Sequence, residues 1–148
     1  MATRSLPDPA LMIAIQKCRR FIGWSQMNTM VWACRGEEGE WFKAKFLALA
    51  HHFDVMPRTY DSDGGGDKAI VHLHYFVGSA DWYILERDQE EAQEQAFGYA
   101  DLFGDDSCAE LGYISIVEII REGAELDLHW QPRTLGEVKA ERAKPRAA

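Results

Sequence analysis

The chain has 148 residues, of which 47% are hydrophobic and 27% are charged, and its formal net charge is −8. This length and composition are typical of a soluble globular protein that buries a core without disulfides or metal, and they exclude a disordered chain. No run approaches the roughly 18 apolar residues of a membrane-spanning helix. The N-terminal segment lacks a small-residue cleavage site, and the three cysteines show no metal-binding spacing, so we expect a cytoplasmic protein with reduced thiols.

Charge is unevenly distributed along the chain. Residues 1–46 carry a net charge of +3, residues 47–138 carry −14, and residues 139–148 carry +3. Binding to a nucleic-acid duplex needs Lys and Arg to neutralise phosphates, and the middle segment has few of them. Its acidity has two interpretations: a solvated surface that maintains solubility, or a face that docks on a basic protein surface.

Helices are predicted in the N-terminal third of the chain. Asp8 can cap a first helix, Pro9 suits its first turn, and apolar residues recur at helical spacing until Gly23 can end it. Residues 30–34 are a candidate short strand. A second helix is predicted over residues 40–53, which carry an aromatic-rich stripe at the same spacing.

Strands dominate the middle of the chain. Residues 70–77 and 82–87 are rich in β-branched and aromatic side chains and are joined by a glycine-containing turn, which predicts a hairpin. Further strands are predicted over residues 96–102 and 110–114. Residues 126–130 are expected to form the last strand.

Two capping boxes predict the remaining helices. Ser115 and Glu118 begin one that Gly123 ends, and Thr134 begins a short C-terminal helix. Helices at both ends and strands in series predict an α+β fold, a single domain with a mainly antiparallel sheet flanked by N-terminal and C-terminal helices. We expect a helical extension, an α+β domain and a frayed basic tail, at residues 1–40, 41–142 and 143–148.

Four residues are candidate metal ligands. His72 and His74 are two apart in a predicted strand, which places both imidazoles on one face, and Asp127 and His129 repeat this spacing in the last predicted strand. If the two strands are neighbours, three imidazoles and a carboxylate would suit zinc or another transition metal. In the alternative interpretation these side chains make ordinary cross-strand hydrogen bonds and no cofactor is bound.

The chain carries no sequence signature of catalysis. It has no Gly-x-Ser-x-Gly elbow, and neither Cys34 nor Cys108 lies in a nucleophile motif. Pairs of carboxylates for acid–base work cannot be chosen from so many acidic side chains. We therefore favour a non-enzymatic protein and leave enzymatic activity open.

Acidic and aromatic residues of the middle segment are the candidate binding residues. Aromatic side chains on strands would stack nucleic-acid bases beside a basic groove, but here their surroundings are acidic. We interpret these aromatic side chains first as part of the core and second as a protein-docking patch. The residues that we expect at a protein-binding surface are Glu90, Glu91, Glu94, Asp105, Asp106, Trp82 and Tyr99.

Several stretches of the sequence resemble a known family in their order and residues. They are DWYILERD (81–88), QAFGYA (95–100), ELGYIS (110–115) and ELDLHW (125–130), preceded by MPRTY (56–60) and HLHYF (72–76). This pattern, over residues 41–142, is similar to the domain of unknown function family 2958 and to related domains of phage and plasmid polyvalent proteins. The resemblance implies an accessory protein of a mobile element in a bacterial cytoplasm, and it carries over no catalytic residue.

Three functional hypotheses follow. The first is a non-enzymatic accessory protein of a phage or mobile element that binds a host or element protein through an acidic surface. A counter-defence inhibitor of the anti-CRISPR or anti-restriction type, which blocks a nucleic-acid-binding complex, is one form of it. The second is a metal-binding module or metal-dependent enzyme that uses the paired histidine strands. The third is a nucleic-acid accessory factor that uses the basic ends of the chain.

Overall fold

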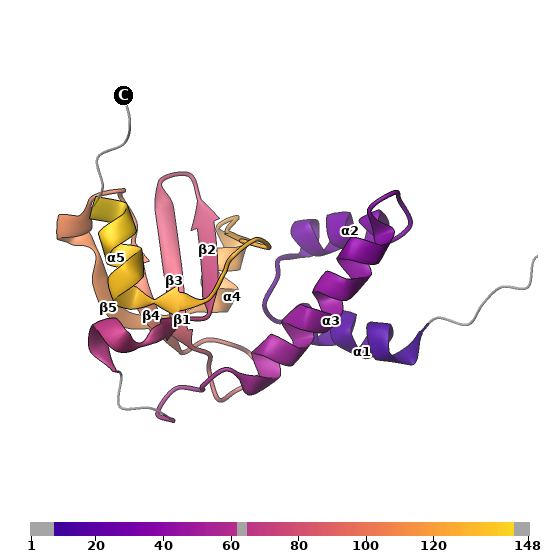
Figure 1. The fold of residues 1–148 in the computed structure, drawn as a ribbon, viewed down its shortest axis with the longest axis horizontal. Coiled ribbons are helices and arrows are strands. Elements are labelled where there is room, and N and C mark those ends of the chain that lie inside the picture. Colours follow the sequence, from indigo (N-terminus) through magenta and orange to yellow (C-terminus); the bar gives the residue numbers. More distant parts are fainter. Residues whose placement is uncertain (1–7, 62–64, 144–148) are drawn as a thin grey trace, which may run out of the picture. The chain divides into compact units, whose positions relative to one another are not determined.

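The computed structural model describes residues 8–61 and 65–143 (Figure 1). Contacts between Cα atoms divide the chain into two compact units, residues 1–55 and residues 56–148. The predicted α+β class is confirmed, because helices accompany a five-stranded sheet in which all neighbouring strands are antiparallel. Among the described residues, no helix is both long and apolar enough to cross a membrane.

The first unit is helical. As predicted, the Asp8 carboxylate accepts a hydrogen bond from the N–H of Ala10 at 3.0 Å and caps the first helix. The side chains of Phe21 and Phe53 stack with ring centroids 3.9 Å apart, and Phe46 is also fully buried. The helices are α1 (Pro9–Cys18), α2 (Trp24–Ala33) and α3 (Gly39–Val55). The unit boundary follows α3, whereas the boundary expected after residue 40 falls within that helix.

Two expectations for the helical unit are wrong. The first helix ends at Cys18, and Gly23 is the N-cap of α2 and not the end of α1. The segment 30–34 is the end of α2 and the following turn, not a strand. Met27 and Met30 explain this result, because a spacing of three places both on one helical face, where they are 2% and 1% exposed.

The three cysteines are free thiols in different surroundings. Cys18 is fully buried, and burial raises the pKa of its thiol to about 12. Burial also raises the pKa of Cys34, whereas Cys108 is exposed. Cys18 therefore acts as a small apolar core residue.

The second unit is built on a five-stranded sheet with the order β5-β4-β3-β2-β6. The predicted hairpin is confirmed, because β2 pairs with β3 through a turn at Gly78, whose φ of 55° suits glycine. A separate two-stranded sheet joins β1 (Ile70–Val71) to β7 (Arg133–Thr134). The strands of the large sheet are β2 (Leu73–Val77), β3 (Ala80–Glu86), β4 (Ala96–Asp101), β5 (Glu110–Ile114) and β6 (Glu125–Leu126).

Two α-helices complete this unit, with the short 3-10 helices η1 (Gly66–Lys68) and η2 (Asp106–Cys108). Ser115 caps α4 (Ile116–Arg121) by accepting from the N–H of Glu118 at 3.2 Å, and Thr134 caps α5 (Leu135–Ala143) in the same way. Helix α5 lies against one face of the sheet (Figure 1), where its apolar residues join a buried cluster. The cluster consists of Leu135, Val138, Val71, Tyr83, Leu85 and Tyr99.

The last strand is shorter than expected, and this correction changes the site. Strand β6 ends at Leu126, and residues 127–130 form a turn. The Asp127 carboxylate accepts from the N–H of His129 at 3.0 Å, a side-chain-to-backbone bond that competes with continued strand pairing. The predicted strand 70–77 is also interrupted, since His72 separates β1 from β2. Asp127 and His129 therefore lie in a turn, and the strand alternation expected for them is absent.

Candidate functional site

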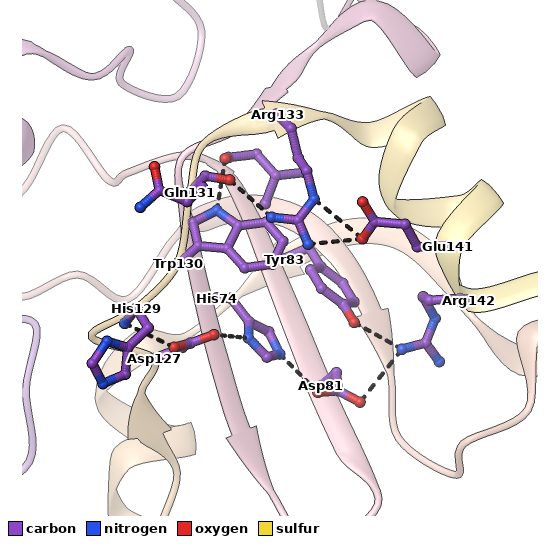
Figure 2. Close-up of polar contacts among 11 residues, drawn as sticks. His74, Asp81, Tyr83, Asp127, His129, Trp130, Gln131, Arg133, Glu141 and Arg142 are labelled. Carbon is purple, nitrogen blue, oxygen red and sulfur yellow. Dashed lines mark hydrogen bonds and ion pairs between the residues drawn. The ribbon is translucent and has the colours of Figure 1, made fainter. Parts of the chain in front are cut away.

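A polar network lies on the face of the sheet that carries α5 (Figure 2). Strand register explains how it assembles: His74 of β2 lies opposite Tyr83 of β3, and Asp81 lies two residues before Tyr83 on the same face. The turn after β6 adds Asp127, and helix α5 adds Arg142. The β2–β3 hairpin and two segments more than 45 residues further along the chain thus contribute to one cluster.

His74 lies between two carboxylates. Its Nδ1 is 3.0 Å from Oδ2 of Asp127, and its Nε2 is 2.7 Å from Oδ1 of Asp81. Ionised carboxylates only accept hydrogen bonds, so both ring nitrogens donate when both aspartates are charged. Both ring nitrogens of His74 are therefore occupied by contacts with carboxylates.

Arg142 continues the network on the other side of Asp81. Its Nη1 donates to the Tyr83 hydroxyl at 2.8 Å and lies 3.4 Å from Oδ2 of Asp81. Its Nη2 forms an ion pair with Asp101, which is fully buried. Burial and the charge of Asp81 raise the pKa of the Tyr83 hydroxyl, and the Arg142 guanidinium opposes that rise.

Aromatic rings enclose the His74 imidazole. The ring stacks on Tyr83 with centroids 4.8 Å apart and planes 9° apart, and Trp130 flanks it at 5.1 Å. The Trp130 indole is held by a hydrogen bond from its Nε1 to the carbonyl of Val71 at 3.0 Å. The Arg133 guanidinium lies over the Trp130 ring, 3.9 Å from its centroid, and pairs with Glu141 at 2.8 Å. The network is therefore packed as well as hydrogen-bonded.

The structure unites two of the four candidate metal ligands. His74 and Asp127 meet, but they do so through a direct hydrogen bond. His129 lies beyond Asp127 with its ring directed away from His74 in Figure 2, and the N–H of His72 bonds to the carbonyl of Ile84 at 2.9 Å. Within residues 8–61 and 65–143, no three His, Cys, Asp or Glu side chains are grouped so that they could hold a metal ion.

This arrangement supports a structural role for the network. Three aspartates, one arginine and one histidine belong to the network, and each is hydrogen-bonded or ion-paired to another member. The contacts join β2, β3, β4, the turn after β6 and α5. Buried charges that are paired in this way are costly to disturb, because removal of one partner leaves the other uncompensated.

The second candidate site is the segment of residues 88–95, which we call the acidic loop. Its centre is the buried Asp88, whose Oδ1 accepts from the N–H of Glu90 at 3.2 Å. Its Oδ2 accepts from the N–H groups of Glu94 and Gln95, both at 3.1 Å. One carboxylate therefore organises three backbone donors, as an aspartate does in a compact turn.

Gln93 completes the interior of the acidic loop. It is 1% exposed, its φ is 56°, and its side chain accepts from the N–H of Asp88 at 2.9 Å and donates to the carbonyl of Glu90 at 3.0 Å. The loop is anchored outside itself as well. The Gln89 side chain bonds to the carbonyl of Thr59, and the N–H of Ile116 bonds to the carbonyl of Gln93 at 2.9 Å.

The predicted protein-binding residues occupy different positions. Glu90, Glu91 and Glu94 are exposed on the acidic loop, and Asp105 is exposed in the turn after β4. Asp106 begins η2, and its side chain lies outside the described part of the chain. Trp82 and Tyr99 are buried, at 5% and 7% exposure, and belong to the interior of the second unit. The first interpretation of these aromatic residues, core packing, matches their positions.

Two features of the structure have no mark in the sequence. Arg142 is a single basic residue near the C-terminus, and no local pattern marks it as a partner of two aspartates and a tyrosine. Tyr60 and Tyr113 are exposed and share a hydrogen bond of 2.9 Å between their hydroxyls, although they are 53 residues apart. Only the β-strand propensity around Tyr113 was visible in the sequence.

Comparisons with protein-family models, curated proteins and solved structures found no match to this chain. The resemblance in residues 41–142 therefore stays a prediction.

Proposed function

We propose that this protein is a non-enzymatic binding protein that engages a basic surface of another protein through the acidic loop. The observation that carries the proposal is the division of charge between the two units. Residues 56–148 hold nineteen acidic and nine basic side chains, a net charge of −10, whereas residues 1–55 have a net charge of +2. The electrostatic field of a net charge of −10 steers a positively charged partner towards the second unit.

The acidic loop is suited to binding because its backbone is already ordered. Asp88 and Gln93 hold its donors and acceptors from inside, so the glutamates need no rearrangement of the loop to reach a partner. Binding costs free energy for every segment that must be ordered, and a preformed loop avoids that cost. Exposed glutamates on a fixed backbone also impose a geometry on the partner, which favours specificity.

The exposed tyrosine pair lies next to this loop. Tyr60 follows Thr59, whose carbonyl accepts from Gln89, and the strand of Tyr113 leads into Ile116, which bonds to the carbonyl of Gln93. Tyrosine rings attract Arg and Lys side chains through cation–π contacts, and tyrosine is enriched at protein interfaces. Tyr60 and Tyr113 therefore add aromatic contacts to an acidic surface, as a basic partner requires.

The partner that fits this surface is a protein with clustered Lys and Arg side chains, such as one that normally holds nucleic acid. An acidic protein that occupies such a surface would compete with the nucleic acid for it. Together with the mobile-element setting that the sequence resemblance implies, this supports the proposal of a counter-defence inhibitor. The proposal needs no catalytic group.

The test reverses the charge of the acidic loop and of a matched control surface. The triple variant Glu90→Lys, Glu91→Lys and Glu94→Lys is compared with Glu118→Lys, Glu122→Lys and Glu125→Lys, which changes three exposed glutamates of the same unit by the same charge. Each tagged full-length protein is used to capture partners from a nuclease-treated bacterial lysate, and the affinity for the captured partner is then measured against salt concentration.

We expect the loop variant to lose at least about tenfold in affinity, whereas the control variant loses about threefold or less, because only the loop makes close charge pairs. Affinity of the unmodified protein should fall as salt rises. Equal losses of affinity in both variants would show that the net charge of the unit determines binding and that the loop glutamates make no specific contribution. A partner that is captured only from a lysate without nuclease treatment would contradict the proposal and favour the nucleic-acid factor.

A further inference from the structure

Strand β5 forms one edge of the five-stranded sheet. In the part of the chain that the structure describes, β5 pairs with β4 alone, from Glu110 opposite Ala100 to Ile114 opposite Ala96. The N–H and C=O groups on the other side of an edge strand point away from the sheet. These groups are a ready template for one more strand.

Two common protections of a sheet edge, proline and lysine, are absent from β5. Its sequence, ELGYI, holds no proline or lysine, and its single charge is on Glu110 at the start of the strand. Leu111 and Tyr113 are 43% and 56% exposed, and they share one face of the strand because they are two residues apart. An added Cβ at Gly112 would meet no atom within 4 Å, so the opposite face is open at that position.

The ends of β5 lie between acidic segments. Asp105 is exposed just before η2, which leads into β5, and Glu110 is the first residue of the strand. Past the other end, the N–H of Ile116 bonds to the carbonyl of Gln93 in the acidic loop. A strand laid along β5 would therefore meet apolar side chains at its centre and carboxylates at both ends.

We propose that β5 accepts an extended segment of the basic partner as an added strand of the sheet. The inference rests on the proposed function, since it takes the basic character of the partner from there. Main-chain hydrogen bonds would supply affinity, and contacts with Leu111 and Tyr113 would select apolar residues at alternate positions of the segment. A second copy of this chain fits the edge poorly, because two units of net charge −10 repel each other.

The test uses the full-length protein and a synthetic nine-residue peptide of alternating arginine and valine. A second peptide has the same side chains but is N-methylated at alternate residues, which removes backbone donors and leaves the charge unchanged. Affinities are measured by calorimetry, and hydrogen exchange is followed at the amides of residues 110–114. The variant Leu111→Lys places a charge on the edge, and Ile70→Lys makes the same change at a residue of similar exposure in the two-stranded sheet.

We expect the unmodified peptide to bind and to slow hydrogen exchange in residues 110–114, whereas the N-methylated peptide binds at least about tenfold more weakly. Leu111→Lys should weaken binding by about tenfold or more, and Ile70→Lys should leave it unchanged. Equal affinity for the two peptides, or equal effects of the two lysine variants, would overturn strand addition.

The two proposals fail in different ways. If charge reversal of the acidic loop weakens peptide binding but N-methylation and Leu111→Lys do not, the acidic surface binds and strand addition is wrong. If the peptide does not bind at all, strand addition is overturned, and the lysate capture tests the proposed function separately.

Discussion

At the scale of single residues, Arg142 provides the opposite charge for one fully buried carboxylate. Asp101 has no exposure to solvent, and Arg142 is its charged partner. The remaining Asp101 contacts are to backbone N–H groups of Phe103 and Asp105, both at 3.2 Å. These dipoles stabilise the carboxylate, but they do not neutralise its charge.

We predict that Arg142→Met lowers the free energy of unfolding by about 3–5 kcal/mol, because it leaves a buried carboxylate without its partner. Arg133→Met is the matched control, since Arg133 also pairs with a carboxylate and an aromatic ring but does so nearer the surface. We expect it to cost about 1 kcal/mol or less. Urea unfolding followed by circular dichroism measures both values.

A second variant separates this cause from a general loss of packing. Asp101→Asn removes the buried charge, so it should recover part of the stability when it is added to Arg142→Met. If Arg142→Met and Arg133→Met cost the same, or if Asp101→Asn makes the double variant less stable, the buried ion pair does not have the role assigned here.

At the scale of elements, the close approach of β3 and β4 depends on a glycine. A Cβ added at Gly98 would lie 2.2 Å from the carbonyl oxygen of Tyr83, a distance that requires the backbones to separate. Gly112 lies directly opposite Gly98 on β5, where an added Cβ meets nothing within 4 Å. The sheet therefore has no room for a side chain at Gly98 but has room for one at Gly112.

We predict that Gly98→Ala destabilises the protein by about 2 kcal/mol or more, through displacement of β4 from β3. Gly112→Ala should change stability by about 0.5 kcal/mol or less, and by restricting the unfolded chain it can even be favourable. Thermal and urea unfolding of both variants measure the difference. Similar losses at the two positions would contradict a steric role for Gly98.

At the scale of the whole molecule, the division of charge follows the division into units. The unit of residues 56–148 contains the buried cluster under α5, the acidic loop and the edge strand β5. The unit of residues 1–55 has a separate interior that includes Phe21, Phe46 and Phe53. All residues invoked in the proposed function belong to the second unit.

We predict that a fragment of residues 56–148 folds cooperatively and binds the captured partner within about threefold of the affinity of the full chain, since it holds its own core and the whole acidic surface. Thermal unfolding followed by circular dichroism reports folding, and the same affinity measurement reports binding. A fragment of residues 1–55 should not bind. A fragment of residues 56–148 that folds but fails to bind would place part of the binding surface in the helical unit.

Much of the fold was predictable from local patterns. The cap at Asp8, the hairpin of β2 and β3, and the capping serine and threonine of α4 and α5 depend on neighbouring residues, and the structure confirms them. The errors came where tertiary contacts compete with local preference. Residues 30–34 joined a helix because Met27 and Met30 share its buried face, and residues 127–130 left the sheet because Asp127 bonds locally and to His74.

In the candidate sites, too, tertiary contacts were not predictable from local sequence patterns. His74 and Asp127 were selected for chemistry that needs free ligands, yet their partners are Asp81 and each other. The glutamates of the acidic loop were expected at a protein-binding surface, but the roles of the buried Asp88 and Gln93 in ordering this loop were not predicted. The identity of a polar residue does not show whether its side chain forms hydrogen bonds with solvent or with groups in the protein interior.

The sequence by itself determined the α+β class, the helix caps, the hairpin and the strong acidity of the second half, because these follow from spacing, propensity and composition. Only the tertiary structure decided that Arg142 meets Asp101, that His74 is enclosed by two carboxylates, and that β5 is a sheet edge. Those features depend on strand order and register, which bring together residues tens of positions apart. Local sequence patterns do not specify such long-range pairings.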